Sequence, residues 1–405
     1  MVTTTQGILA LVGGYLVLCK ALRYRRRNAQ HAKFPYKNPE DFSKMTAEDA
    51  FEIVRYVMSL EFPFTGTKAL EFALFRTYGI PTISKLLAQT QQLSTPQYAA
   101  RRYADTGILI GEFLAQSPTS ERANAALARL NFLHGRYQKA GKISNDDLLY
   151  TLALFVLEVE RWIRLYEWRS LTPMEICAFG THWKSIGDAM GIQYDDLAHG
   201  PSSFTSGYEF FQDIQSWAQT YEEKHMVPDP YNRQLANETV RILTANVPNA
   251  LMPQAEKLVV SLMYPRLRAA MLYDAPAPIY THLTEFALNA RKFVLRHLTL
   301  PRPECLRFRL VSEDKDPVTG RYQRLVYSME PWYVPADGWN WLSPLEWFRW
   351  ATGRAVPNGK QYKPTGFKIS EIGPAKMEGK GIEECSEEFN RLMSAPRGAC
   401  PFAFK

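Results

Sequence analysis

The residue best suited to chemistry along this chain is a histidine on the apolar face of a predicted helix. His134 lies in the stretch RLNFLHGRYQKAGK, residues 129–142, four residues after Leu130 and seven after Leu127. Helical periodicity places these three side chains on one face. The pattern alone favours a core imidazole that bonds a neighbouring carbonyl. The alternative is an axial haem ligand that projects from the helix into an apolar slot.

An arginine and a threonine share one face of the preceding predicted helix. Arg102 and Thr106 stand four residues apart, and Asp105 lies beside them. A cation and a hydroxyl displayed together on a mostly apolar helix could serve bound dioxygen or a haem propionate. They could also form a helix-surface pair with Asp105 or Glu112. The spacing leaves both interpretations open.

A non-haem iron site is a weaker alternative. Glu222 and His225 have the i, i+3 spacing found in di-iron carboxylate bundles. Asp196 and His199 repeat that spacing, but a glycine and a proline follow at once and predict the end of a helix. Four converging carboxylates cannot be identified, and no hydrolase elbow, HExxH or Cys–His signature occurs.

The elements that must position these residues are helices. The sequence lacks strand–helix alternation and glycine-rich phosphate motifs, so it predicts an all-α body. The predicted helices cover residues 46–62, 66–79, 80–93, 95–117, 117–142, 144–169, 171–191, 206–224, 232–245, 252–272 and 280–298. After residue 301, two alternating runs around Asp316-Pro317 and Gly320 predict a β-hairpin.

An aromatic cluster follows in this C-terminal extension. Its residues are Trp339, Trp341, Trp347, Phe348 and Trp350, and Ser343-Pro344 predicts a helix start among them. Tryptophans beside arginines suit a membrane interface, but an arm packed onto the helical body fits equally well.

The N-terminal segment predicts a membrane anchor. Residues 3–19 contain no charge, and as a helix they measure about 26 Å, close to the roughly 27 Å hydrocarbon thickness of the endoplasmic reticulum. The bases follow the apolar run, whereas in a signal peptide they precede it. By the positive-inside rule the body stays in the cytosol. The predicted organisation is an anchor at residues 1–33, a helical domain at 34–300 and an extension at 301–405.

The charge distribution agrees with this organisation. The 405 residues contain 48 Lys plus Arg and 41 Asp plus Glu, and the first 39 residues hold seven of the bases and no acid. The remaining chain is therefore formally neutral, which argues against a nucleic-acid partner. The five cysteines form no CxxC or zinc spacing, as expected of free thiols in a reducing compartment.

Several motifs resemble those of a known family. The stretches that carry the resemblance are RRYADTGILIGE (101–112), RLNFLHGRYQKAGKISNDDLLYTLALF (129–155), FGTHWKSIGDAMGI (179–192), LEFPF, FALFRTYGIPTIS, HMVPDP, AMLYDAP and CPF. They resemble the endoplasmic-reticulum-bound, MpaB-type oxygenases of mycophenolic acid biosynthesis over nearly the whole chain. The rubber oxygenases, or latex clearing proteins, are similar only over roughly residues 60–270.

The resemblance implies a globin-like helical domain that binds haem b. His134 takes the place of the axial histidine, although the family's Arg-x-x-His motif is not kept, because Asn131 stands three residues before it. Arg102 and Thr106 match the ends of the distal Arg-x-x-Lys-Thr motif, with Asp105 in place of the lysine. Asp105 would then be a polar or basic group near the distal pocket. Thr151 matches a threonine on the next helix, expected to line or support the haem site.

The resemblance also implies a reaction and its partners. The expected reaction is dioxygen-dependent cleavage of a C=C bond in the prenyl side chain of a meroterpenoid intermediate, giving an aldehyde or acid at the endoplasmic-reticulum membrane. The haem would bind and activate dioxygen, and Arg102 would steady a polarised oxygen. Two alternatives remain at this point: a non-catalytic, membrane-tethered haem- or lipid-binding protein, and a non-haem iron enzyme.

Overall fold

The structure, a computed structural model, describes residues 4–200, 204–337, 343–357 and 359–403. Within these ranges it contains sixteen α-helices and no regular strand, so the all-α prediction is confirmed and the globin-like arrangement stays a prediction. In chain order the α-helices are α1 (Thr4–Leu22), α2 (Arg25–Lys33), α3 (Ala47–Tyr56), α4 (Pro63–Thr77), α5 (Pro81–Thr90), α6 (Pro96–Ala115), α7 (Glu121–Lys139), α8 (Asn145–Tyr166), α9 (Pro173–Ala189), α10 (Gly207–His225), α11 (Pro230–Leu243), α12 (Met252–Ser261), α13 (Pro265–Ala270), α14 (Pro278–His297), α15 (Pro344–Ala351) and α16 (Ile382–Ser394).

Short helical segments connect several of these helices. The segment η2 (Val57–Glu61) is a π-helical turn between α3 and α4. The 3-10 segments are η1 (Pro39–Lys44), η3 (Asn249–Leu251), η4 (Glu304–Leu306), η6 (Lys360–Tyr362), η7 (Ile369–Glu371) and η8 (Ala375–Met377).

The helix starts follow from local chemistry. The hydroxyl of Ser144 accepts a hydrogen bond from the Asp147 amide at 3.0 Å, and Thr172 forms a reciprocal capping box with Glu175. Proline also ends one helix earlier than predicted: the single helix expected over residues 252–272 divides into α12 and α13, because Pro265 has no amide hydrogen to continue the ladder.

The predicted β-hairpin is wrong. Residues 316–320 do turn, with the Gly320 amide 2.8 Å from the Asp316 carbonyl, but only two isolated bridges form nearby, Val311 with Arg324 and Tyr322 with Phe367. Other amides in the two runs bond elsewhere, such as that of Phe308, which donates to the Ser59 carbonyl. A regular two-strand ladder is therefore replaced by irregular contacts with the rest of the molecule.

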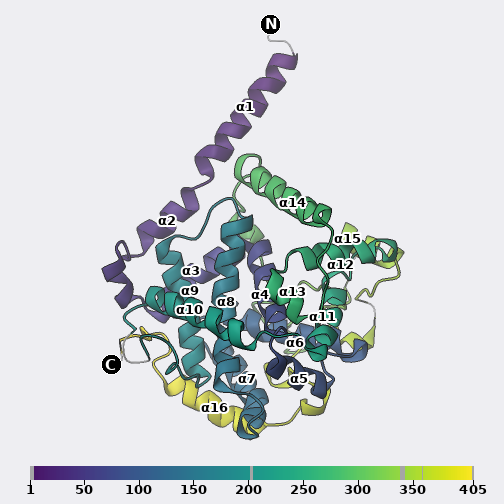
Figure 1. Ribbon diagram of the computed structural model, residues 1–405. Helices are drawn as coiled ribbons and strands as arrows, with labels where there is room; N and C mark the ends of the chain where they lie inside the picture. Colours follow the sequence, from purple (N-terminus) through teal and green to yellow (C-terminus); the bar gives the residue numbers. More distant parts are fainter. Residues whose placement is uncertain (1–3, 201–203, 338–342, 358, 404–405) are drawn as a thin grey trace.

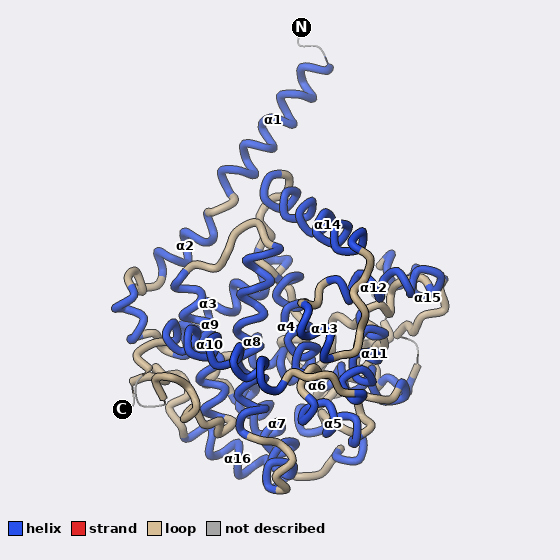
Figure 2. Tube along the Cα trace, in the orientation of Figure 1, coloured by secondary structure: helices blue, strands red, loops and turns tan. Residues whose placement is uncertain are grey.

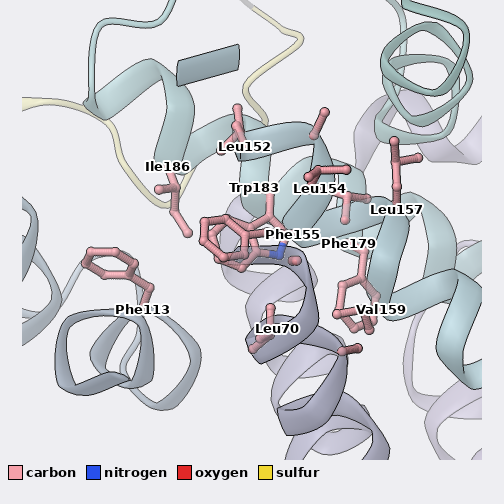
Figure 3. Close-up of a cluster of buried hydrophobic side chains, with 14 of the residues drawn as sticks. Leu70, Phe113, Leu152, Leu154, Phe155, Leu157, Val159, Phe179, Trp183 and Ile186 are labelled. Atoms are coloured by element: carbon pink, nitrogen blue, oxygen red, sulfur yellow. The ribbon is translucent and has the colours of Figure 1, made fainter. Parts of the chain in front are cut away.

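The centre of the body is α8, which is buried along most of its length. It packs against α4, α9 and α10, and Figures 1 and 2 show it running through the middle of the helical assembly. The Phe155 ring of α8 stacks on the Trp183 ring of α9 with centroids 4.7 Å apart. Figure 3 shows these two rings among neighbouring apolar side chains, including Leu70 of α4 and Phe113 of α6. This core holds the helices that carry the candidate site.

The helix α1 projects away from this body (Figure 1). Together with α2 it is the one part of the described chain that has the length and apolar composition to cross a membrane. At its base, the Tyr15 hydroxyl donates to the Leu298 carbonyl at 3.1 Å, and the Arg23 guanidinium bonds the Thr299 carbonyl. The neighbouring α14 buries none of its side chains and exposes Leu283 and Phe286.

The C-terminal extension folds back onto the body. Helix α16, which is yellow in Figure 1, packs along α7. Helix α15 starts at Pro344, as predicted; it buries Glu346 and Arg349 and exposes Trp350. Trp339 and Trp341 of the aromatic cluster lie outside the described residues. The domain boundary near residue 300 stays a prediction.

Candidate functional site

Arg102 and Thr106 form a bonded pair on α6. The Arg102 Nη1 donates to the Thr106 Oγ1 at 2.9 Å, and that hydroxyl donates to the Arg102 carbonyl at 2.9 Å. The surface-pair interpretation is wrong, because Glu112 accepts from Arg122 Nη2 at 2.8 Å and Asp105 accepts from Tyr333. Among the described residues, no carboxylate lies within ion-pair distance of Arg102. Its charge is therefore available to a ligand.

His134 lies on α7 close enough to Arg102 to be influenced by its charge. Burial, with a further contribution from Arg102, lowers the pKa of His134 to about 4, so the imidazole is neutral at pH 7. Its Nδ1 is buried and has no hydrogen-bond partner among the described residues. A core histidine bonded to a carbonyl would have such a partner. A neutral imidazole with an orphaned ring nitrogen fits the requirements of an axial haem ligand.

A second histidine with a buried, unbonded ring nitrogen shows why this feature alone does not identify a ligand. Burial lowers the pKa of His182 on α9 to about 3, and its Nε2 also lacks a partner in the described chain. The cavity beside it measures only about 10 Å³ and is closed by Phe113, Ile186 and Arg397. That volume holds at most about one water molecule. Sequence analysis did not single out His182. The cation that influences its pKa is Arg397 and not Arg102, and this difference in surroundings separates it from His134.

Asp105 points toward the C-terminal extension. It is fully buried on α6, and its Oδ1 accepts a hydrogen bond from the Tyr333 hydroxyl at 2.8 Å. Burial raises the pKa of Asp105 to about 6, and the Tyr333 hydrogen bond and the Arg101 guanidinium, 3.9 Å away, limit the rise. This carboxyl can hold a proton close to neutral pH. Tyr333 could not be foreseen, because it is 228 residues away in sequence.

Thr151 occupies a half-buried position on α8. Its hydroxyl donates to the Asp147 carbonyl one turn earlier, at 2.8 Å. That bond orients the Oγ1 and leaves its lone pairs as acceptors. Contact between Thr151 and a cofactor stays a prediction.

The residues of the non-haem alternative are engaged in other contacts. Glu222 accepts from the Tyr150 hydroxyl at 2.6 Å and from the Tyr264 hydroxyl at 2.7 Å, and it also pairs with Arg76. The His225 ring stacks on a tyrosine of its own helix, with centroids 4.5 Å apart. Across the described residues, no group of three or more His, Cys, Asp or Glu side chains is placed to share a metal ion.

A cavity of about 780 Å³ lies on a neighbouring face of α6. Its walls are α3, α4, α6 and residues 307–328 of the extension, and this volume suits a drug-sized ligand. Tyr103 and Gly107 of α6 line it, whereas Arg102, Thr106 and His134 do not. A Cβ atom added to Gly107 would meet no atom within 4 Å, so the cavity reaches the backbone next to Thr106.

Arg129 and Asn131, the near matches to the family's arginine position, have structural contacts. Arg129 is buried, and its guanidinium donates to the carbonyls of Ile372, Lys380 and Met377 in the extension. Asn131 donates to the Ala189 carbonyl at 2.9 Å and to Glu388 at 2.6 Å. These hydrogen bonds connect α7 to the extension and, through Ala189, to α9.

Comparison with known proteins identifies relatives over most of the chain. Residues 84–290 match the family described as "ER-bound oxygenase mpaB/B'/Rubber oxygenase, catalytic domain". The ER-bound oxygenase mpaB' of Penicillium brevicompactum is 44% identical over 405 residues, which covers 98% of this chain and 95% of that protein. The ER-bound oxygenase mpaB of the same species is 40% identical, covering 89% and 87% respectively. An mpaB of Penicillium roqueforti (strain FM164) is 47% identical, covering 65% and 89%.

Proposed function

The chain belongs to the ER-bound oxygenase mpaB and rubber oxygenase family, and on that premise we propose that it is a membrane-anchored, haem-dependent oxygenase. Its proposed reaction cleaves a C=C bond in the prenyl side chain of a meroterpenoid intermediate. The observation that supports a haem site best is the neutral, unbonded imidazole of His134 beside the carboxylate-free guanidinium of Arg102.

The residues of the chain have separate proposed roles. His134 would hold the iron of haem b, which supplies the binding and activation of dioxygen. Arg102 would donate a hydrogen bond to a polarised oxygen, and Thr106 fixes the orientation of the guanidinium. Thr151 is proposed to support the haem site. Asp105 lies on the same turn of α6 as Arg102 and Thr106. Its carboxyl group can hold or release a proton near neutral pH.

The proposed reaction balances without an external reductant. The C=C double bond and the O–O bond break, and two C=O bonds form, so each former alkene carbon receives one oxygen atom. An aldehyde is the direct product when the cleaved carbon carries a hydrogen. An acid product requires a further two-electron oxidation of that aldehyde.

The experiment that tests this function is turnover of a farnesylated phenol under ¹⁸O₂ by the full-length protein in lipid nanodiscs. We expect a chain-shortened carbonyl product that carries ¹⁸O, detected by mass spectrometry. Arg102→Leu should lower the turnover rate about a hundredfold and keep the haem spectrum, since the arginine acts on the developing charge. Haem-loaded protein that yields no shortened product from a range of prenylated substrates would favour the non-catalytic binding protein.

We also propose that α1 anchors the protein in the endoplasmic-reticulum membrane with the body in the cytosol. The relatives are described as ER-bound, and α1 exposes Leu9, Leu11 and Val17. The outward apolar side chains of α14, next to the base of α1, support a bilayer-facing side. A prenylated substrate partitions into the same bilayer at about 0.8 kcal/mol per buried CH₂.

Deleting residues 1–22 is expected to release most of the protein from the membrane fraction. This deletion keeps Arg23 and Arg26, which contact the body at Thr299 and Glu61. The measurement is carbonate-resistant sedimentation, with protease protection of the full-length protein to report the side on which the body lies. A truncated protein that remains wholly in the carbonate-resistant pellet would show that α1 is not the main attachment.

A further inference from the structure

The wall that the extension contributes to the 780 Å³ cavity contains a buried cation without a partner. Arg324 lines this cavity, and only 4% of the residue is exposed. Its Nε is buried without a hydrogen bond, and its guanidinium forms no ion pair with any described carboxylate. Its backbone amide donates to the Tyr333 carbonyl at 2.9 Å, which fixes this part of the chain.

The acids nearest to Arg324 are committed to other groups. Glu71 pairs with Lys68 at 2.7 Å, and its charge contributes to the raised pKa of Tyr103. Asp105 accepts from the Tyr333 hydroxyl. Neither carboxylate is close enough to Arg324 to form an ion pair, although the charges of both favour the protonated guanidinium from a longer distance.

The other cations that line the cavity have acidic partners. Lys33 pairs with Glu52, Arg55 and Arg309 both pair with Glu313, and Arg307 pairs with Glu304. Much of the remaining wall is apolar. These apolar side chains include Leu70, Leu74, Ile110, Leu114, Phe308 and Leu310. The cavity therefore combines these apolar side chains with one desolvated cation that has no ion-pair partner. Four carboxylates also line it, those of Glu48, Glu52, Glu71 and Glu313.

A buried guanidinium that lacks an ion-pair partner favours one class of ligand. Desolvation of a charge is costly unless an opposite charge replaces the lost water, and the planar fork of arginine matches a carboxylate in two parallel hydrogen bonds. Lys33 of α2 and Glu52 of α3 also line the cavity, and α2 directly follows the apolar helix α1. The cavity wall is therefore connected to the predicted membrane helix, as suits an amphipathic molecule held in the membrane.

We propose that Arg324 is a carboxylate-binding residue, and that the substrate of this protein is a prenylated compound whose head group carries a carboxylate. The identification of the ligand as the substrate rests on the proposed function. Arg324 lies outside residues 84–290, so this recognition is supplied by the extension and not by the catalytic domain that the wider family shares.

The test compares the binding of a farnesylated benzoic acid with that of its methyl ester, measured by calorimetry on full-length protein in nanodiscs. Wild-type protein should bind the acid about ten to a hundred times more tightly than the ester, as expected for a charged, bidentate contact. Arg324→Leu should remove this preference, and Arg324→Lys should keep part of it. Because binding is measured without turnover, the result does not depend on whether the protein cleaves either compound.

Two matched measurements separate the possible sources of the carboxylate. Arg307→Leu, at a cavity-lining cation that is already paired, should leave the acid-to-ester ratio unchanged. If Arg324→Leu instead speeds haem loss at least about tenfold and leaves that ratio unchanged, the carboxylate bound is a haem propionate, and the substrate assignment is overturned. Wild-type acid and ester affinities that are equal, together with unchanged haem retention in Arg324→Leu, would overturn carboxylate binding altogether.

A stability measurement shows whether the Arg324→Leu variant is correctly folded. Replacing an unpaired buried cation with an apolar side chain removes a desolvation penalty, so ligand-free Arg324→Leu should unfold at a temperature equal to or above that of wild type. A marked fall in its unfolding temperature would mean that the guanidinium already has a stabilising partner, and would contradict the premise of the proposal.

Discussion

Replacing His134 with alanine is expected to give a folded protein that has lost nearly all of its haem. The imidazole is the neutral group with an orphaned nitrogen beside Arg102, and alanine offers no ligand to the iron. The ring forms no hydrogen bond with the described residues, so the free energy of unfolding should change by only about 1 kcal/mol. The measurements are haem content by the pyridine haemochrome assay and helical content by circular dichroism.

The matched control is His182, the other neutral histidine with a buried, unbonded ring nitrogen. His182→Gln should keep its haem, because the cation that influences that ring is Arg397 and not the Arg102 that is bonded to Thr106. A second variant, His134→Gly supplied with free imidazole, should recover a haem spectrum if the missing ring is the only defect. Full haem content in His134→Ala would overturn the assignment of the ligand and return the non-haem alternative to consideration.

The inward position of His134 could be predicted from the sequence, but its chemical state could not. Periodicity places the ring on the same face as Leu127 and Leu130, where a bonded core histidine is the commoner outcome. Only the three-dimensional surroundings show that its Nδ1 lacks a partner and that Arg102 is not neutralised by a carboxylate. The family resemblance indicated the residue, and the structure supplies the physical reason to favour it.

The path and the contacts of the C-terminal extension could not be predicted from the sequence, for a different reason. Its contacts join residues more than 200 positions apart, such as Tyr333 with Asp105 and Lys380 with Arg129. Alternation in residues 321–327 could place Arg324 on a strand face, but a lone arginine in such a pattern usually faces water. Because the expected strand ladder does not form, the path of this segment depends on contacts that a local pattern does not encode.

The residues proposed for dioxygen chemistry and the residue proposed for substrate recognition lie in different parts of the chain. The residues proposed for dioxygen chemistry lie on α6, α7 and α8, inside the region matched by the family. One wall of the large cavity, with Arg324, comes from the extension, which the 44% identical mpaB' relative also covers. If both proposals are correct, a change in the extension should alter the choice of substrate and leave the residues around His134 in place.

The strongest connection between the two parts is Arg129, and replacing it with alanine is expected to lower the free energy of unfolding by about 3 kcal/mol or more. Only 1% of the residue is exposed, and its guanidinium donates to the carbonyls of Ile372 and Lys380 at 2.8 Å and of Met377 at 2.9 Å. Alanine removes three charge-assisted bonds and leaves those carbonyls without their donor. The measurement is urea unfolding of the detergent-solubilised protein.

Limited proteolysis distinguishes release of the extension from general destabilisation. In Arg129→Ala the peptide bonds of residues 372–380 should be cut well before those of α8, because the three lost bonds all end in that segment. Arg136→Ala on the same helix should change stability by no more than about 0.5 kcal/mol, since that exposed side chain contacts the Met377 sulfur, at 3.3 Å, and the neighbouring Tyr137 ring. Wild-type stability and wild-type protection of residues 372–380 in Arg129→Ala would contradict this account. If the account is correct, the same variant should lose the preference for an acidic ligand and keep its haem, because Arg324 is held by the extension and His134 by α7.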